Sequence, residues 1–250
     1  MTDPRPRTCT VVVQGLRVGR STPRPGESLR AAAERAVADV AGLRGRVVWP
    51  LDLSRREALF ECESPERDVA AWPSIAFRPL TRADFRDVVA WQAQPHVARW
   101  WGEEATGLQA AEAHYGPAID GDDPARLWVL ELNGRSVGFL QDYRIGDHPA
   151  YALLTARPDA VGFDYLVGDP GWVGRGVGTR MLWVYLRDVV VPGYPEASEL
   201  FAAPDHRNLA SLRVLDKLGF TRGLWFDEPQ SDGRVDTVVG CTLDVAAVLG

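Results

Sequence analysis

The feature that most constrains this chain is a glycine-rich segment between an apolar stretch and a helix-like stretch. Its sequence is Val173-Gly-Arg-Gly-Val-Gly-Thr179, and the apolar run Val161–Val167 precedes it. Glycine tolerates positive φ and close approach of a ligand, so successive N–H groups can converge on an anion at the start of a helix. The segment therefore predicts a strand, a turn able to cradle a phosphate group, and a helix beginning near residue 178. The alternative is a strand-to-helix connection that needs small residues for structural reasons only.

Two better-known phosphate-binding patterns do not fit this segment. No Lys-Ser or Lys-Thr pair follows Gly178, so the Walker form of the loop is absent. The Gly-x-Gly-x-x-Gly fingerprint cannot be read here, and the strand comes late in the chain instead of opening a βαβ unit. The glycines alone therefore do not identify the ligand.

Composition narrows the class of protein. The chain has 250 residues and a formal net charge of −6, which allows one or two domains with a substantial core. No apolar run approaches the ~20 residues of a membrane helix and nothing argues for secretion, so we expect a cytoplasmic protein without a membrane partner. The negative charge argues against nucleic acid as a partner and is compatible with a cationic small molecule.

The cysteines predict neither a disulfide framework nor a metal site. Cys9, Cys62 and Cys241 are widely separated, odd in number and unaccompanied by histidine at metal-ligand spacing. We expect three buried thiols and no bound metal.

Hydrophobic periodicity and composition divide the chain into two units. Residues 1–63 predict a small α/β domain with two strands and a helix, at residues 8–14, 58–62 and 27–43. Residues 64–73 are rich in proline and charge and predict a linker. Residues 74–250 predict a larger α+β domain, in which the Asn133-Gly134 pair between two strand-like runs is typical of a type I′ hairpin turn.

Several motifs of the larger domain together resemble the GNAT superfamily of acetyl-CoA-dependent N-acetyltransferases. Gly174–Thr179 resembles the pyrophosphate loop of that family, and Asn208–Phe220 resembles its later helix, in which Asn, Ala and a terminal Gly-Phe recur. Trp91–Gly102 and Leu132–Tyr143 are similar to the aminoglycoside 6′-N-acetyltransferases of the Ib type and to acetyltransferases of lysine-derived siderophores. The resemblance covers about residues 75–245. It implies an α+β fold in which helices flank a mixed, mostly antiparallel central sheet.

The resemblance implies acetyl-CoA as the acetyl donor and assigns it a binding surface. The pyrophosphate would lie on the loop formed by Val173, Gly174, Arg175, Gly176, Val177, Gly178 and Thr179. Backbone N–H groups beside a strand bulge would hold the thioester oxygen, near Tyr165, Leu166 and Val167. Asn208 would contact the pantetheine arm, or cap the helix that follows it, or do both. Arg175 would pair with a phosphate or remain solvated.

Two positions depart from the family pattern. The family usually has Gln or Arg where this chain has Val173, so we expect mostly backbone contacts to the phosphates. The family often has a tyrosine general acid at the position of Leu215, and that acid is excluded here.

Asp164 is the candidate base. An alkyl amine is almost entirely protonated at pH 7 and must lose a proton before it attacks a thioester. Asp164 interrupts an apolar strand, where a carboxylate is costly unless it is paired or functional. By resemblance it aligns with an active-site Asp of the aminoglycoside-type enzymes. The alternative is a carboxylate on the solvent face of the strand.

The acceptor is the least constrained part. Four residues besides Asp164 are predicted to line its cleft: Trp101, Gln141, Asp142 and Tyr143. His96 is expected to be structural and Asp205 to form a turn. Ala203 stands where the aminoglycoside enzymes often have an acidic residue, which puts aminoglycoside specificity in doubt.

The sequence thus predicts acetyl transfer to a primary amine of a small cationic, aminoglycoside-like acceptor. Direct transfer in a ternary complex is expected, because no cysteine lies in the motifs near the cleft to form an acetyl-enzyme. The alternatives are a hydroxylysine-type siderophore precursor or a protein lysine as acceptor, and a catalytically idle CoA-binding module. A monomer or a homodimer is expected.

Overall fold

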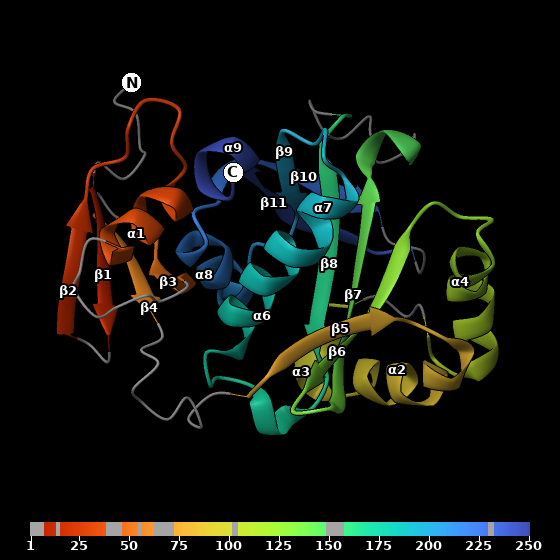
Figure 1. Cartoon of the computed structure of the whole chain (residues 1–250). Helices are drawn as coiled ribbons and strands as arrows, with labels where there is room; N and C mark the ends of the chain where they lie inside the picture. Colours follow the sequence, from red (N-terminus) through yellow and green to blue (C-terminus); the bar gives the residue numbers. More distant parts are fainter. Residues whose placement is uncertain are drawn as a thin grey trace.

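The computed structural model of the chain contains two β-sheets, one of four strands and one of seven, with helices packed against both (Figure 1). The strands and helices follow from the hydrophobic periods of the sequence, and they carry the buried residues of the core. The structure describes residues 8–13, 16–38, 47–54, 57–62, 73–101, 105–148, 158–229 and 233–250.

The four-stranded sheet belongs to the N-terminal part of the chain. Its strands lie in the order β2-β1-β4-β3, and one helix, α1, packs on it. Their bounds are β1 Thr8–Val13, β2 Leu16–Ser21, α1 Leu29–Ala38, β3 Val47–Asp52 and β4 Glu57–Cys62.

The sequence predicted β1, β4 and α1 but not the other two strands of this sheet. In β2, a Cβ on Gly19 would lie 2.5 Å from the carbonyl oxygen of Ala36, so glycine is needed for α1 to approach the strand closely. In β3, Pro50 argues against a strand in any reading of the sequence alone. The expected end of the helix, residues 39–43, and nearly all of the linker at 64–73 lie outside the described residues.

The seven-stranded sheet has the order β10-β11-β9-β8-β7-β6-β5. All neighbouring strands in it are antiparallel except β8 and β9, which are parallel. The prediction of a mixed, mostly antiparallel sheet is confirmed. The strand bounds are β5 Ile75–Pro79, β6 Arg126–Leu132, β7 Arg135–Arg144, β8 Val161–Val167, β9 Glu199–Ala202, β10 Thr221–Pro229 and β11 Val235–Asp244.

Helices cover both faces of this sheet. Their bounds are α2 Phe85–Gln92, α3 Pro95–Ala98, α4 Leu108–Asp120, α6 Val177–Tyr185, α7 Val191–Gly193, α8 Leu209–Lys217 and α9 Val245–Val248. Residues of α2, α3 and α4 form one hydrophobic cluster with Phe139 and Leu166 of the sheet. Residues of α6, α8 and the N-terminal unit form a second cluster, against which Tyr165 packs. The side chains of β8 therefore alternate between the two clusters.

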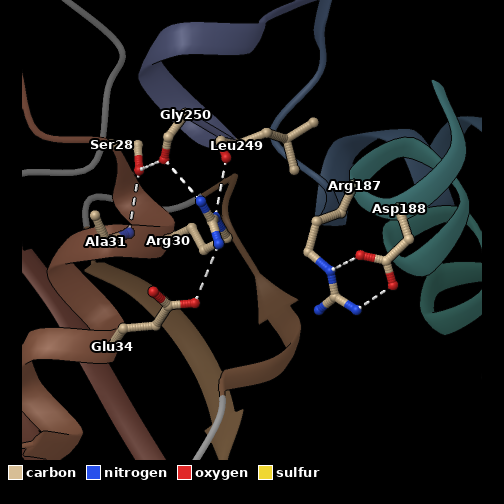
Figure 2. A network of polar contacts seen from close by, with 8 residues as sticks. All are labelled: Ser28, Arg30, Ala31, Glu34, Arg187, Asp188, Leu249 and Gly250. Atoms are coloured by element: carbon tan, nitrogen blue, oxygen red, sulfur yellow. Dashed lines mark hydrogen bonds and ion pairs between the residues drawn. The ribbon is translucent and has the colours of Figure 1, made fainter. Parts of the chain in front are cut away.

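The four-stranded sheet shares one core with α6, α8 and the seven-stranded sheet. Phe60 of β4 meets Trp183 of α6 with ring centroids 6.1 Å apart, and the N–H of Leu53 donates to the carbonyl of Lys217 at 2.9 Å. Figure 2 shows α1 bound to the last residues of the chain: the Ser28 hydroxyl donates to the Gly250 carbonyl at 2.7 Å, and Arg30 Nε donates to the Leu249 carbonyl at 2.9 Å. The predicted division into two domains stays a prediction.

Two local predictions can be compared directly with the structure. Asn133 and Gly134 have φ values of 51° and 73°, as a type I′ turn between β6 and β7 requires. All three cysteines are buried, as expected. Within the described ranges no helix is long and apolar enough to cross a membrane, and no group of His, Cys, Asp and Glu side chains is arranged to hold a metal ion.

Candidate active site

The site begins where β8 and β9 separate. Their parallel pairing is limited to Val161 with Leu200 and Gly162 with Phe201, whereas β8 continues to Val167. A gap therefore opens beside the second half of β8. On its other edge β8 pairs with β7 without any register shift. The bulge expected near residues 165–167 is thus absent from this pairing, and the splay of β9 alone opens the sheet.

The backbone of β8 is available on the side of the gap. Because the N–H of Gly168 donates to the carbonyl of Val137 at 2.8 Å, alternation along the β7–β8 ladder makes the even-numbered residues of β8 the partners of β7. Tyr165 and Val167 then direct their backbone groups toward the gap. His96 Nε2 lies 2.8 Å from the carbonyl oxygen of Val167, in agreement with that direction and with the structural role expected for His96. An extended ligand can pair with this edge as a strand would.

The glycine segment forms the N-terminal end of α6, as predicted, with the helix starting at Val177. Gly174 and Gly176 have φ values of 75° and 78°, which glycine adopts without strain. A Cβ on Gly174 would meet no atom within 4 Å, so this part of the loop is open, whereas a Cβ on Gly178 would lie 3.4 Å from Val214 of α8. The first two glycines therefore set the backbone conformation and the third allows α6 and α8 to pack closely.

This helix end can accept an anion. The N–H groups of Val177, Gly178 and Thr179 belong to the first turn of α6, where no partner exists within the helix. Gly176 occupies the N-cap position and has no side chain to bind them. Val173 is 48% exposed and Arg175 is exposed as well. The loop thus presents backbone donors, and Arg175 is the cationic side chain within it.

A groove leads from the 173–179 loop to the gap between β8 and β9. It lies between the α3 segment and α8, and its lining includes His96, Trp172, Val173, Thr179, Arg213 and Lys217. Asn208 also lines it, while its side-chain oxygen accepts the N–H of Ser211 at 3.1 Å and so caps α8. The capping role predicted for Asn208 is confirmed. The two cations at the α8 side suit a ligand that carries phosphate.

A second cleft continues from the groove on the far side of the gap. Five residues line both hollows: Trp100, Trp101, Tyr165, Asn208 and Ser211. The second cleft is also lined by Gln141, Tyr143 and Asp164, so the structure brings together four of the five residues predicted for the acceptor. Asp164 is half-buried, and Gln141 Nε2 donates to its Oδ2 at 2.9 Å.

Asp142 is the exception and requires a correction. It pairs with Phe163 across the β7–β8 ladder and therefore points to the face opposite that of its two neighbours in β7. Its side chain is fully buried and accepts hydrogen bonds from Arg126 Nε at 2.5 Å, Trp128 Nε1 at 2.8 Å and the Tyr185 hydroxyl at 2.5 Å. Asp142 does not line the cleft. It holds the face of the sheet that packs on α6.

Replacing Asp142 by alanine is expected to lower the free energy of unfolding by about 3–5 kcal/mol, because Arg126, the half-buried Trp128 and the buried Tyr185 lose their acceptor. The KM for the amine substrate should not change. Urea unfolding and steady-state kinetics measure the two quantities, and Asp122→Ala, at an exposed site, is the control. A raised KM with unchanged stability would restore the acceptor role that the sequence suggested.

The sequence missed two acidic residues of this cleft, Glu228 of β10 and Asp236 of β11. They pair directly across the β10–β11 ladder, an arrangement in which like charges destabilise a sheet unless a cation lies nearby. Arg207 lies 3.7 Å from Asp236 and also pairs with Asp205. Its guanidinium holds the pKa of Asp205 below the usual range. The predicted turn at Asp205 is confirmed, since its side chain accepts the N–H of Arg207 at 2.7 Å.

Comparison with known proteins identifies the class. Residues 81–227, more than half of the chain, match the family model described as an acetyltransferase (GNAT) domain. The chain belongs to the GNAT family and is an N-acetyltransferase. Acetyl-CoA is the acetyl donor in this family.

Two relatives and one solved structure show how near the chain lies to characterised members. It is 26% identical over 152 residues to aminoglycoside N(6′)-acetyltransferase type 1 of Klebsiella pneumoniae, covering 60% of this chain and 75% of the relative. It is 30% identical over 159 residues to mycothiol acetyltransferase of Thermomonospora curvata, covering 63% of this chain and 42% of the relative. The structure of AAC(6′)-Ib in complex with paromomycin and acetyl-CoA superposes with a TM-score of 0.59 at 23% identity, over 68% of this chain and 93% of that one.

Proposed function

We propose that this protein transfers the acetyl group of acetyl-CoA to a primary amine of a small cationic acceptor, directly and within a ternary complex. One observation carries the proposal. A groove suited to a phosphate-bearing ligand and a cleft rich in carboxylates meet at the β8–β9 gap, where Asp164 lies. Donor and acceptor can therefore meet without passing through a covalent enzyme intermediate.

The donor lies along the groove. The backbone N–H groups of the 173–179 loop bind the pyrophosphate, and the helix dipole of α6 adds roughly 0.3–1 kcal/mol per charge. Asn208 binds the pantetheine arm, whose amides pair with the open edge of β8 beside Tyr165 and Val167. The N–H groups of this edge face the thioester oxygen, where negative charge develops as the amine attacks. Leu166 directs its side chain into the α2–α4 cluster and contributes through its place in the strand.

Asp164 supplies the base. An alkyl amine with a pKa near 10.4 is neutral in only about one molecule in 2,500 at pH 7, which handicaps attack by roughly 4.6 kcal/mol. Asp164 attracts the ammonium group and takes its proton, directly or through water. The hydrogen bond from Gln141 orients its carboxylate. Tyr143 and Trp101 form the walls of the acceptor cleft, and the indole of Trp101 adds cation–π attraction.

The carboxylates of the cleft determine the acceptor class. Besides Asp164, the cleft is lined by Asp205, Glu228 and Asp236, and Arg207 compensates part of this charge. An acceptor with more than one ammonium group fits this distribution of charge best. The similarity to a Klebsiella pneumoniae aminoglycoside acetyltransferase supports an aminoglycoside-like polycation, although Ala203 leaves one expected acidic group missing.

A thiol-release assay with acetyl-CoA tests the proposal. Kanamycin, spermidine, N6-hydroxylysine and a lysine-containing peptide are offered as acceptors. We expect the highest kcat/KM with a polycation. A preference for hydroxylysine or the peptide would move the function to siderophore or protein acetylation. Binding of CoA without turnover on any amine would refute the proposal and identify an idle CoA-binding module.

A further inference from the structure

Two hydroxyl groups meet at the junction of the groove and the cleft. The hydroxyl oxygen of Tyr165, on β8, lies 2.7 Å from the hydroxyl oxygen of Ser211, on α8. Of the five described residues that line both hollows, these two carry hydroxyl groups, and the other three carry indole or amide groups. The pair is therefore the source of hydroxyl protons at the place where the donor thioester and the acceptor amine meet.

Tyr165 and Asp164 lie on opposite faces of one strand. Successive side chains of a strand alternate, and in β8 Asp164 shares its face with Leu166, which packs against α2–α4. Tyr165 packs against the cluster that contains α6 and α8, and Phe163 stacks with it at 6.3 Å. A thioester in the gap would thus have a carboxylate on the acceptor side and a hydroxyl on the side of α8.

On the side of α8 that faces Tyr165, the residue one turn after Ser211 cannot donate a proton. Leu215 lies one turn after Ser211 on the same side of α8 and is fully buried. Side chains of a helix lean toward its N-terminus, so a longer residue at 215 would reach the region that the Ser211 hydroxyl now occupies. Tyr165 reaches this region from the opposite element, the strand.

We propose that the Tyr165 hydroxyl, hydrogen-bonded to Ser211, is the catalytic group that gives a proton to the departing thiolate of CoA. The inference rests on the proposed function. The amine nitrogen forms a bond to the acetyl carbon, and the bond from that carbon to sulfur breaks. The sulfur takes the proton of Tyr165, Ser211 replaces it and takes one from water in the cleft, and the amine proton goes to Asp164 and then to solvent.

The surroundings of Tyr165 suit this role. Burial raises the pKa of Tyr165 well above its ordinary value, the hydrogen bond with Ser211 lowers it in part, and the charges of Cys241 and Asp164 raise it further. Tyr165 therefore keeps its proton throughout the working pH range. A phenolate would be costly at this position, so the proton must be replaced as it leaves, which is the function of the hydrogen bond with Ser211.

Tyr165→Phe tests the inference by two measurements. Turnover with acetyl-CoA and kanamycin or spermidine should fall about 10- to 100-fold, with the KM for acetyl-CoA changed less than about threefold, because the proton is needed only as the bond to sulfur breaks. The pKa of the thiol of bound CoA, followed by the ultraviolet absorption of the thiolate, should rise by about 0.5 to 1, because the thiolate loses a hydrogen bond. This second measurement needs no acceptor.

Ser211→Ala and the double variant complete the cycle. The double variant should be no slower than Tyr165→Phe alone, because the two hydroxyls act as a unit. Tyr194→Phe is the matched control: it removes the hydroxyl of a buried tyrosine on the same face of the sheet, whose ring centroid lies 4.4 Å from the guanidinium carbon of Arg126 and which lines neither hollow, and it should leave both quantities unchanged.

The two proposals fail in different ways. An unchanged pKa of the bound thiol, or an unchanged kcat in an active enzyme, overturns the role of Tyr165 and leaves the acetyltransferase intact. A shifted pKa of the bound thiol, together with turnover that is confined to hydroxylysine or the peptide and falls in Tyr165→Phe, supports Tyr165 and overturns the proposed acceptor. Failure of the parent protein to bind CoA overturns both.

Discussion

Replacing Asp164 by asparagine is expected to lower kcat for amine acetylation by about 10²- to 10³-fold, with little change in the affinity for CoA. The carboxylate lies in the acceptor cleft and on the face of β8 opposite the α8 wall of the donor groove. Asparagine keeps the shape and can still bind Gln141 Nε2, but it cannot take a proton from the ammonium group. Steady-state kinetics and calorimetric titration with CoA measure the two quantities.

The same variant should respond to pH in a defined way. Once the base is lost, turnover depends on the fraction of amine that is already neutral. As long as the pH is below the amine pKa, this fraction increases tenfold for each unit by which the pH rises. The deficit of Asp164→Asn should therefore shrink as pH rises. Asp122→Asn removes an exposed charge outside the site and is the control; it should change neither kcat nor its pH dependence. An Asp164→Asn enzyme as fast as the parent would remove this residue from the mechanism.

The elements of the acetyltransferase region could be predicted because their local patterns agree with their environment. The glycine loop, the Asn-Gly hairpin and the capped helix at Asn208 each have a local physical cause. In contrast, β2 and β3 contain a glycine and a proline that are explained only by the helix that covers the one strand and by the edge position of the other. Tertiary packing determines these two strands.

The site was harder to predict than the fold, for reasons that individual residues make plain. Asp142 lies between Gln141 and Tyr143 in sequence, but the alternation of a strand sends it to the opposite face, where it binds Arg126. Glu228 and Asp236 become neighbours only when the last two strands pair. Tyr165 was assigned to the donor through its backbone, and the contact of its side chain with Ser211 depends on how β8 faces α8. Each case needs the register or the packing of a second element.

The N-terminal unit affects the site through the core. Phe60 contacts Trp183 of α6, and Leu53 binds the carbonyl of Lys217 at the end of α8. These are the two helices whose N-terminal ends carry the glycine cradle and Asn208. The small sheet thus packs against the two helices that carry the proposed donor site.

Two substitutions at Gly176 are expected to separate the effect of charge in the 173–179 loop on CoA affinity from the effect of loop conformation. Asparagine and aspartate have nearly the same shape, and both tolerate the left-handed conformation that Gly176 adopts at φ 78°. Gly176→Asp places a negative charge beside the pyrophosphate. At about 5 Å and an effective dielectric constant of about 20–40, this charge would repel one phosphate charge by roughly 2–3 kcal/mol. The affinity of Gly176→Asp for CoA should therefore be about 10- to 100-fold lower than that of Gly176→Asn.

The charge at position 176 should lower the affinity for CoA without lowering the stability of the fold, so the two effects can be distinguished. A carboxylate at the N-terminal end of α6 interacts favourably with the helix dipole, so the Tm of the aspartate variant should be no lower than that of the asparagine variant. Added salt should reduce the difference in affinity between the two, because it screens an exposed charge pair. Equal affinities of the two variants for CoA would mean that the pyrophosphate does not lie at this helix end, and the assignment of the 173–179 loop would then be wrong.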